Sequence, residues 1–334
     1  MRIVVDAFGG DNAPLEIIKG AALAHKEYGV DITLTGNEET IRKCIDDNGL
    51  IFKNLIIEHT DDVISMHDEP TSLLKAHKNS SLGLAFQILN EGKADALVSA
   101  GSTGAIVVGG TLMVKRIKGV KRPALGSMLP GLNANYFLMD MGANAECRPE
   151  MLKQFGIMAS VYLEGVEGRK NPKIALLNIG TEDTKGDELR KEAYKQLSEA
   201  PINFVGNVES REMPKGDVDG IVTDGFTGNI AIKLMEGSIS SLFKMLKGAF
   251  YKNLLNKLAA GVLKKDLYSL KAKMDSSEVG GAPLLGVLKP VIKAHGSSDA
   301  RAIKNAIRQA KTFAENDVIG TIQKYIASED AQNA

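Results

Sequence analysis

Short apolar segments alternate with longer segments of helical periodicity along most of this chain. Near-continuous apolar runs are typical of strands buried on both faces, and their alternation with helices is typical of parallel sheets. The pattern therefore predicts an α/β protein whose largely parallel sheet is covered by helices on both faces. The predicted strands, each followed closely by glycine, are residues 3–6, 32–35, 97–99, 136–140, 174–178, 204–205 and 221–224.

Helical stripes fill the gaps between these strands. Apolar residues recur every three or four positions after Pro14, within 82–89, within 303–313 and within 319–326. Pro14 suits the first turn of a helix. The chain has no internal repeat, no low-complexity linker and no clear boundary, so we expect one α/β domain over residues 1–334.

The segment 236–273 differs from the rest in its charge. From 244 to 273 it holds eight lysines and a single acid, Asp266, a net charge of about +7 in a chain whose formal net charge is zero. Apolar residues form one helical stripe before residue 251 and another at Leu254, Leu255, Leu258 and Val262. The pattern predicts a basic amphipathic helical hairpin. It fits an ordinary solvated hairpin, and it equally fits an element that meets a membrane surface or an acidic protein.

Composition narrows the class of protein. Lysine plus arginine number 41 against 41 acidic residues, so no global field favours nucleic acid. Cys44 and Cys147 are isolated thiols, which fits a reducing compartment. The N-terminal residues lack a signal-peptide pattern, and no apolar run approaches the roughly 18 residues of a spanning helix. We therefore expect a cytoplasmic protein that neither binds nucleic acid nor crosses a membrane.

Two glycine-rich turns stand where parallel sheets bind ligands, beyond the carboxyl ends of strands. Residues 99–105 run from a strand into the start of a helix, and residues 224–229 repeat that arrangement. Small residues let backbone N–H groups approach an anion, and the helix terminus favours negative charge. With Gly9, Gly10 and Asp11 these turns predict a phosphate-bearing or otherwise anionic ligand, although glycine can also merely permit a tight turn.

Other signatures of catalysis are weak. The chain has no G-x-G-x-x-G, G-x-x-x-x-G-K-[ST], G-x-S-x-G or H-E-x-x-H motif. The five histidines are scattered without metal-ligand spacing, so we expect no metal, but His295 stands at the entry to a helix where an anion could bind. Cys147 could be a nucleophile whose pKa is lowered by Arg148, yet no partner base is apparent.

Taken together, the loop sequences resemble a known family over nearly the whole chain. The blocks that carry the resemblance, in order, are residues 6–14, 99–105, 139–144, 177–182 with 185–186, 206–209, 224–229, and 280–286 with 295–298. They are similar to the bacterial phosphate acyltransferases. Phe8 stands where methionine is expected in many relatives, and Ser102 where asparagine is frequent, but neither change removes a ligand group.

The resemblance implies an activity and a setting. It implies transfer of a long-chain fatty acyl group from acyl carrier protein to inorganic phosphate, giving acyl phosphate for phospholipid (phosphatidate) synthesis without a cofactor. It also implies a fold like that of the isocitrate and isopropylmalate dehydrogenases and the phosphotransacetylases, a homodimer, and peripheral association with an anionic membrane surface.

The reaction explains why no catalytic triad is visible. Phosphate is partly dianionic near neutral pH and a thiol of pKa near 8.5 leaves readily, so positioning and charge stabilisation can suffice. Lys185 is expected to supply a cation, and Asn229 or a loop N–H to face the developing oxyanion. Asp224 and Asp140 are expected to orient loops or Lys185, and His295 to lie at the site. The residues expected to bind phosphate or substrate are Gly9, Gly10, Asp11, Ser99, Gly101, Ser102, Thr103, Gly104, Asp140, Asn144, Asn178, Gly180, Glu182, Asn207, Glu209, Gly225, Thr227, Gly228 and Gly281.

The apolar residues of the hairpin indicate which of its possible partners the tip contacts. Leu254, Leu255, Leu258, Val262 and Leu263 would give a short helix a face able to enter lipid headgroups. We therefore expect this tip to be exposed and to rest on the membrane, with lysines such as Lys257 steering lipid and carrier protein.

Two other classes of function remain open from the sequence. A nicotinamide-dependent dehydrogenase of the related fold would need metal-binding acids and a cofactor loop. A non-catalytic membrane or carrier-protein adaptor would use the lysine-rich hairpin alone.

Overall fold

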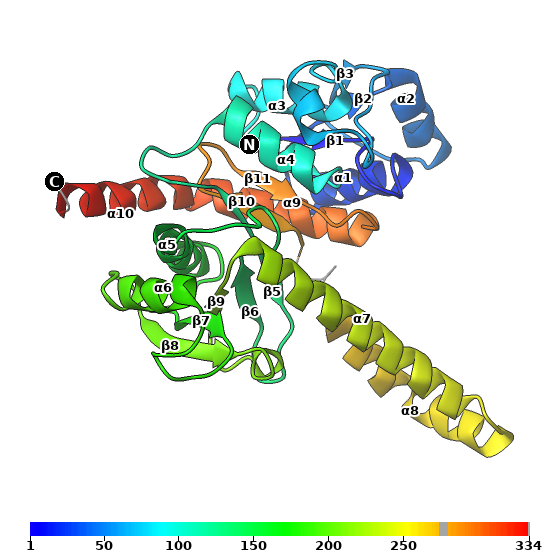
Figure 1. The fold of residues 1–334 in the computed structure, drawn as a ribbon. Coiled ribbons are helices and arrows are strands. Elements are labelled where there is room, and N and C mark those ends of the chain that lie inside the picture. Colours follow the sequence, from blue (N-terminus) through cyan, green and yellow to red (C-terminus); the bar gives the residue numbers. More distant parts are fainter. Residues whose placement is uncertain (274–279, 333–334) are drawn as a thin grey trace.

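The computed structural model describes residues 1–273 and 280–332 and contains one sheet of 11 strands (Figure 1). The strand order is β3-β2-β1-β4-β11-β10-β5-β6-β9-β7-β8. Five parallel strands form the N-terminal half: β1 (Arg2–Asp6), β2 (Asp31–Gly36), β3 (Ile56–His59), β4 (Ala96–Ser99) and β11 (Val291–Lys293). Four parallel strands form the C-terminal half: β6 (Tyr136–Met139), β7 (Ile174–Asn178), β8 (Phe204–Glu209) and β9 (Gly220–Val222).

Two central strands join the halves by antiparallel pairing. They are β5 (Ala124–Leu129) and β10 (Ala282–Leu285), which pair with each other, with β6 and with β11. The strands of the two halves therefore run in opposite directions. The prediction of a largely parallel sheet is confirmed, and the antiparallel centre is an addition that hydrophobic patterning did not reveal.

Helices cover both faces of the sheet, as predicted. In β1, Ile3 and Val5 belong to one buried cluster, whereas Val4 between them belongs to another. The first cluster lies under α1 (Leu15–Tyr28), α5 (Pro149–Gly165), α9 (Ala300–Glu315) and α10 (Val318–Gln332), and the second under α3 (Ser81–Asn90) and α4 (Thr103–Gly109). The remaining helices of the body are α2 (Glu38–Asp47), α6 (Glu188–Ser198), η1 (Pro70–Leu74), η2 (Gly110–Val114) and η3 (Met213–Lys215).

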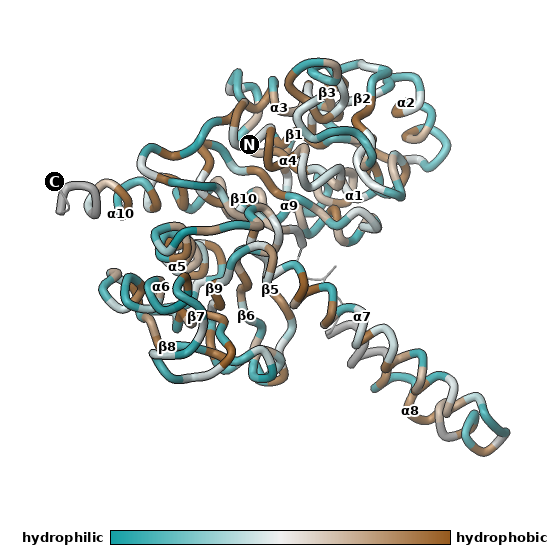
Figure 2. Tube along the Cα trace, viewed as in Figure 1, coloured by the Kyte–Doolittle hydropathy of each residue, from teal (hydrophilic) through white to brown (hydrophobic). Residues whose placement is uncertain are grey.

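The two longest helices form a hairpin that projects from the body. In Figure 1, α7 (Gly225–Phe250) leaves the C-terminal half toward the lower right, and α8 (Leu254–Lys273) returns beside it. Gly228 and Ile232 are buried where α7 starts, and beyond them the helix has only half-buried and exposed residues. Figure 2 shows hydrophobic and hydrophilic positions interspersed along the hairpin, whereas the strands of the body are mainly hydrophobic. Among the described residues no helix is long and apolar enough to cross a membrane.

Candidate active site

The first predicted turn is fixed by a buried pair at the ends of β1 and β4. Ser99 Oγ donates to Asp6 Oδ2 at 2.7 Å and accepts from Gly101 N–H at 3.0 Å. Burial raises the pKa of Asp6 despite these hydrogen bonds. A Cβ on Gly9 would lie 2.5 Å from Asp6 Oδ2 and 2.7 Å from Gly101 N, so the two glycine turns touch. The Ser99 hydroxyl therefore holds the turns together and leaves ligand contact to their backbone.

Lys293 ends β11 directly beside Ser99, its partner in the β11–β4 register. Its ammonium donates to Ala294 O at 3.0 Å, and burial lowers the pKa of Lys293 against the opposing effects of Glu236 and Asp11. Those two acids lie on α7 and on the turn after β1, so Lys293 stands where the hairpin base meets the N-terminal half.

The turn after β1 is tied to the segment that contains His295. Asp11 N–H donates to Gly296 O at 2.8 Å, and the Asn12 side chain donates to Ser297 O at 3.0 Å. His295 is exposed, and its Nδ1 accepts from Ser297 N–H at 3.2 Å, which leaves Nε2 available to solvent or a ligand.

Asp140 organises the loop after β6. Its carboxylate accepts backbone N–H groups of Leu125 at 3.2 Å, Gly142 at 3.1 Å, Ala143 at 3.0 Å and Asn144 at 2.8 Å. Burial raises its pKa, and these donors oppose the increase. With all of its surface buried, Asp140 orients the loop and leaves the loop's outer atoms to face a ligand.

Asp224 caps the N-terminus of α7 and also binds a cation. It accepts from Thr227 N–H at 2.9 Å, and it forms a short ion pair with Arg190 of α6. Arg190 also donates to Thr227 Oγ1 at 3.0 Å and contacts Asp187 at 2.7 Å. The sequence predicts that Asp224 orients a loop or Lys185. In the structure Asp224 caps the turn into α7, and its cationic partner is Arg190.

Lys185 lies on the adjoining loop after β7. Its side chain is exposed, and its carbonyl accepts from Asn178 Nδ2 at 3.1 Å. Asn178 also donates to Asn207 Oδ1 at 3.2 Å, and Asn207 donates to Glu182 O at 2.7 Å. A Cβ on Gly186 would lie 2.6 Å from Asn178 Oδ1 and 2.9 Å from Arg190 Cβ. The Lys185 loop is therefore packed against the Arg190 group.

These loops form one connected group at the C-terminal half. Gly225 N–H donates to Asn144 O at 2.7 Å, and a Cβ on Gly142 would lie 3.6 Å from Asn229. Met141 and Ala143 pack against the N-terminal cluster that includes Ile106 of α4. The loop 140–144 thus contacts the start of α7 through Gly225 and packs against a cluster that includes residues of the N-terminal half.

The predicted residues divide by exposure. Lys185, Glu182, Asp11 and His295 are exposed. Half-buried residues are Gly10, Thr103, Gly104, Asn144, Asn207, Glu209, Thr227 and Asn229, and buried ones are Gly9, Ser99, Gly101, Ser102, Asp140, Asn178, Gly180, Asp224, Gly225, Gly228 and Gly281. Gly281 serves packing, because its Cβ would lie 2.5 Å from Ile292 and 2.7 Å from Lys293 O. Glu209 is paired with Arg211 at 2.7 Å.

The sequence pattern does not reveal the roles of three charged residues in this region. Asp6 lay within a block that carried the family resemblance but was given no role. Arg190 and Lys293 sit in segments whose patterns resemble an ordinary polar helix and an ordinary strand end. Only the tertiary contacts place Arg190 beside Asp224 and Lys293 beside Ser99.

Cys147 has the properties of a structural thiol. Burial raises its pKa to about 12, and its Sγ lies 3.7 Å from Asn144 O. The charge of Arg148 could have favoured a thiolate, but that side chain is exposed and lies 4.0 Å from Glu150. The geometry therefore favours a protonated Cys147.

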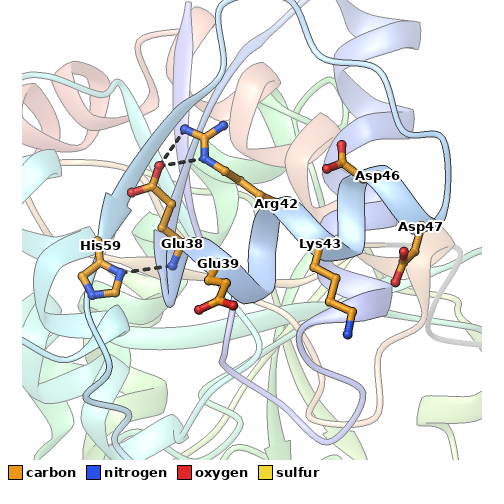
Figure 3. A pocket seen from close by; sticks show the side chains of 7 residues that line it. All are labelled: Glu38, Glu39, Arg42, Lys43, Asp46, Asp47 and His59. Carbon is orange, nitrogen blue, oxygen red and sulfur yellow. Dashed lines mark hydrogen bonds and ion pairs between the residues drawn. The ribbon is translucent and has the colours of Figure 1, made fainter.

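A separate hollow over α2 is lined by Glu38, Glu39, Arg42, Lys43, Asp46, Asp47 and His59 (Figure 3). Glu38 forms an ion pair with Arg42 at 2.6 Å, and its N–H donates to His59 Nδ1 at 3.1 Å. None of these residues belongs to the predicted site. Among the described residues no group of three or more His, Cys, Asp or Glu side chains could hold a metal ion.

Comparison with known proteins identifies the family. Residues 1–321 match the family described as "Fatty acid synthesis protein". A phosphate acyltransferase from Oceanobacillus iheyensis is 49% identical over 329 residues, covering 98% of each chain, and one from Bacillus cereus is 47% identical over 334 residues.

Solved structures agree at the level of fold. A phosphotransacetylase from Streptococcus pyogenes has a TM-score of 0.64 at 17% identity over 94% of each chain, which confirms the expected phosphotransacetylase-like fold. The likeness to the isocitrate and isopropylmalate dehydrogenases stays a prediction. The chain belongs to the family of phosphate acyltransferases and is an enzyme of that class.

Proposed function

From this family membership we propose that the enzyme transfers a long-chain fatty acyl group from acyl carrier protein to inorganic phosphate, releasing acyl phosphate for phosphatidate synthesis. One observation supports the proposal above the others: a single network of contacts links the ends of β6, β9 and β7 to the N-terminus of the 26-residue helix α7. Such a terminus, with two cationic side chains nearby, suits an anionic substrate.

Some residues of the site would face the phosphate, and others hold the loops in position. The positive N-terminal end of α7 and the exposed ammonium of Lys185 would attract the anion, while Arg190 offsets the charge of Asp224. Asp140 and Asn178 lie behind the loops and fix them. The carboxylates of Asp140 and Asp224 already accept hydrogen bonds, and Asp224 is also paired with Arg190. They therefore repel the phosphate less than free charges would.

Phosphate would attack the thioester carbonyl directly. One phosphate oxygen forms a bond to the carbonyl carbon, the carbon–sulfur bond breaks, and the thiolate leaves with the electron pair. Asn229, beside Gly142, and Lys293, from the opposite half, would stabilise the negative charge that develops on the carbonyl oxygen. No acyl-enzyme is needed, which agrees with the raised pKa of Cys147.

The proposed setting is a homodimer at an anionic membrane surface in the cytoplasm. Phe226 and Ile230 are exposed on one stripe of α7, a surface that a second copy of the chain would cover. The apolar tip of α8 would contact lipid. Static light scattering of the purified protein tests the dimer: a mass near twice the 35.8 kDa chain supports it, and a monomer contradicts it.

The activity is tested with long-chain acyl carrier protein. Incubation with inorganic phosphate should release free carrier protein thiol, and hydroxylamine should trap the acyl phosphate as hydroxamate. Omission of phosphate is the control for simple hydrolysis. Thioester loss that does not depend on phosphate would contradict the proposal, and carrier-protein binding without turnover would favour a non-catalytic adaptor.

A further inference from the structure

A cluster of cations lies outside the site described above, on the segment between η2 and β5. Residues 115–122 hold Lys115, Arg116, Lys118, Lys121 and Arg122 without an acidic residue. All five are exposed, while Ile117 and Val120 between them are buried. We call this segment, together with Arg148, the cationic ridge.

The ridge is held rigidly by its neighbours. Gln154 of α5, itself 6% exposed, accepts from Lys121 N–H at 2.8 Å and donates to Gly119 O at 3.0 Å. Ile117 N–H donates to Gly286 O at 2.9 Å, and Leu288 N–H donates to Lys115 O at 3.0 Å. A segment anchored at both ends and in its middle presents its side chains from fixed backbone positions.

The charges of the ridge are largely unneutralised. Within the described part of the chain, Lys118, Lys121 and Arg122 form no ion pair with a carboxylate. Glu150 lines the hollow beside the ridge and lies 4.0 Å from Arg148. A hollow of 380 Å³ opens here, lined by Thr111, Leu112, Arg116, Lys121, Arg122, Arg148, Glu150 and Met151.

The ridge adjoins the loop 140–144 of the candidate active site. Pro123 directly follows it, and Pro123 O accepts from Asn144 Nδ2 at 2.8 Å. Leu125, two residues further, donates its N–H to Asp140 at 3.2 Å. A partner held on the ridge would therefore lie next to the loop 140–144, on the side of the molecule away from the hairpin tip. In Figure 1, α5 lies to the left and the hairpin leaves toward the lower right.

We propose that the cationic ridge is the docking surface for the acidic acyl carrier protein. This inference rests on the proposed function, since it concerns the donor of the acyl group. Complementary charge supports the assignment, because an array of fixed, unpaired cations steers an acidic partner and fixes its orientation. Leu112, which lines the hollow and is 56% exposed, offers an apolar contact beside these charges.

A membrane fits this surface less well. Lipid-binding elements combine basic residues with an exposed apolar face, and the hairpin tip has such a face. The hollow beside the ridge has a single exposed large apolar side chain among its lining residues, Leu112. The two basic regions are therefore assigned to different partners.

The test is the double variant Lys118→Glu/Arg122→Glu. Its KM for long-chain acyl carrier protein should rise by about tenfold or more, with kcat and the KM for phosphate within twofold of wild type. With an acyl thioester of N-acetylcysteamine, which lacks carrier protein and phosphate groups, the two enzymes should behave alike. Lys43→Glu, a charge reversal at one exposed position on α2, is the control for a nonspecific effect of charge.

Direct binding separates this inference from the proposed function. Fluorescence anisotropy of labelled carrier protein should show weaker affinity for the double variant whether or not phosphate-dependent turnover is observed. If the double variant melts normally and its KM and affinity for carrier protein are unchanged, the ridge is not the docking surface. Equal losses with both thioesters, which indicate a substrate site, would also overturn the inference, and so would loss of anionic-vesicle binding alone, which indicates a lipid surface.

Discussion

Arg190 and Asp224 form a short ion pair that joins α6 to the N-terminus of α7. The side chains are 17% and 6% exposed, so both charges are largely removed from water. Asp224 also caps α7, and Arg190 also bonds Thr227, so the pair sets the position of the turn in which phosphate is expected.

Arg190→Gln should destabilise the fold and depress turnover. Loss of the cation leaves a buried carboxylate without its partner, which costs about 3 kcal/mol in the free energy of unfolding. Arg190→Lys keeps the charge but loses the planar fork, so it should recover stability more than turnover. Urea unfolding and steady-state rates of both variants check this. Equal behaviour of the two variants would show that charge alone matters.

Lys185→Met should lower turnover by about 100-fold or more while the protein stays folded, because a preorganised cation beside developing charge contributes on that scale. The side chain is exposed, so its removal leaves no cavity. Lys191→Met, an exposed change on α6, is the control. Near-normal turnover in a folded Lys185→Met enzyme would remove Lys185 from the mechanism.

Gly101→Val should raise the KM for phosphate. A Cβ here would lie 3.1 Å from Ser99 Oγ and 3.5 Å from Asp6 Oδ2, so the added side chain must point away from the pair and over the turn. It would then block the backbone approach of an anion. Initial rates at varied phosphate measure the effect, and thermal melting checks the fold. An unchanged KM for phosphate would show that the turn 99–105 does not contact phosphate, which would leave the turn into α7 as its site.

Much of the fold was predictable because buried strands and amphipathic helices leave strong local signals. The strands and helical stripes identified from spacing correspond to β1, β2, β4, β6 to β9, α1, α3, α9 and α10. The strands β3, β5, β10 and β11 and the antiparallel joining of the halves were not predicted. Pairing direction depends on long-range contacts, which local patterning does not reveal. Likewise, the sequence places Asp224 in a turn from a strand into a helix, whereas its ion pair with Arg190, 34 positions away, is not evident from the sequence.

Cys147→Ala should remain active with normal turnover. With a pKa of about 12, the thiol is protonated at neutral pH and is a poor nucleophile. Alkylation by iodoacetamide should accordingly be slow near pH 7 and should accelerate as pH rises toward that pKa. Initial-rate patterns should require both substrates to be bound together. Ping-pong kinetics, or a trapped acyl-Cys147 competent for transfer to phosphate, would contradict direct attack.

The last prediction concerns the tip of the hairpin. Its predicted exposure is confirmed for Leu255, Leu258, Val262 and Leu263, which are 76%, 64%, 82% and 43% exposed. The side chain of Leu254 lies outside the described residues. Contact of this tip with a membrane stays a proposal.

Leu258→Glu should release the protein from anionic vesicles without changing the KM for phosphate. An exposed leucine contributes little to folding but can enter the headgroup boundary, where a carboxylate is unfavourable next to anionic lipid. Lys257, whose ammonium lies 5.9 Å from the Tyr251 ring centroid, supplies charge, so Lys257→Glu should weaken vesicle binding most at low salt.

Vesicle flotation paired with thermal melting distinguishes the outcomes. Ile51→Glu, at a position that is 78% exposed and far along the sheet from the hairpin, is the control and should bind vesicles like wild type. If Leu258→Glu floats normally, the tip has another partner. If Leu258→Glu melts at a much lower temperature than wild type, a second copy of the chain covers Leu258, because this side chain is 64% exposed within its own chain.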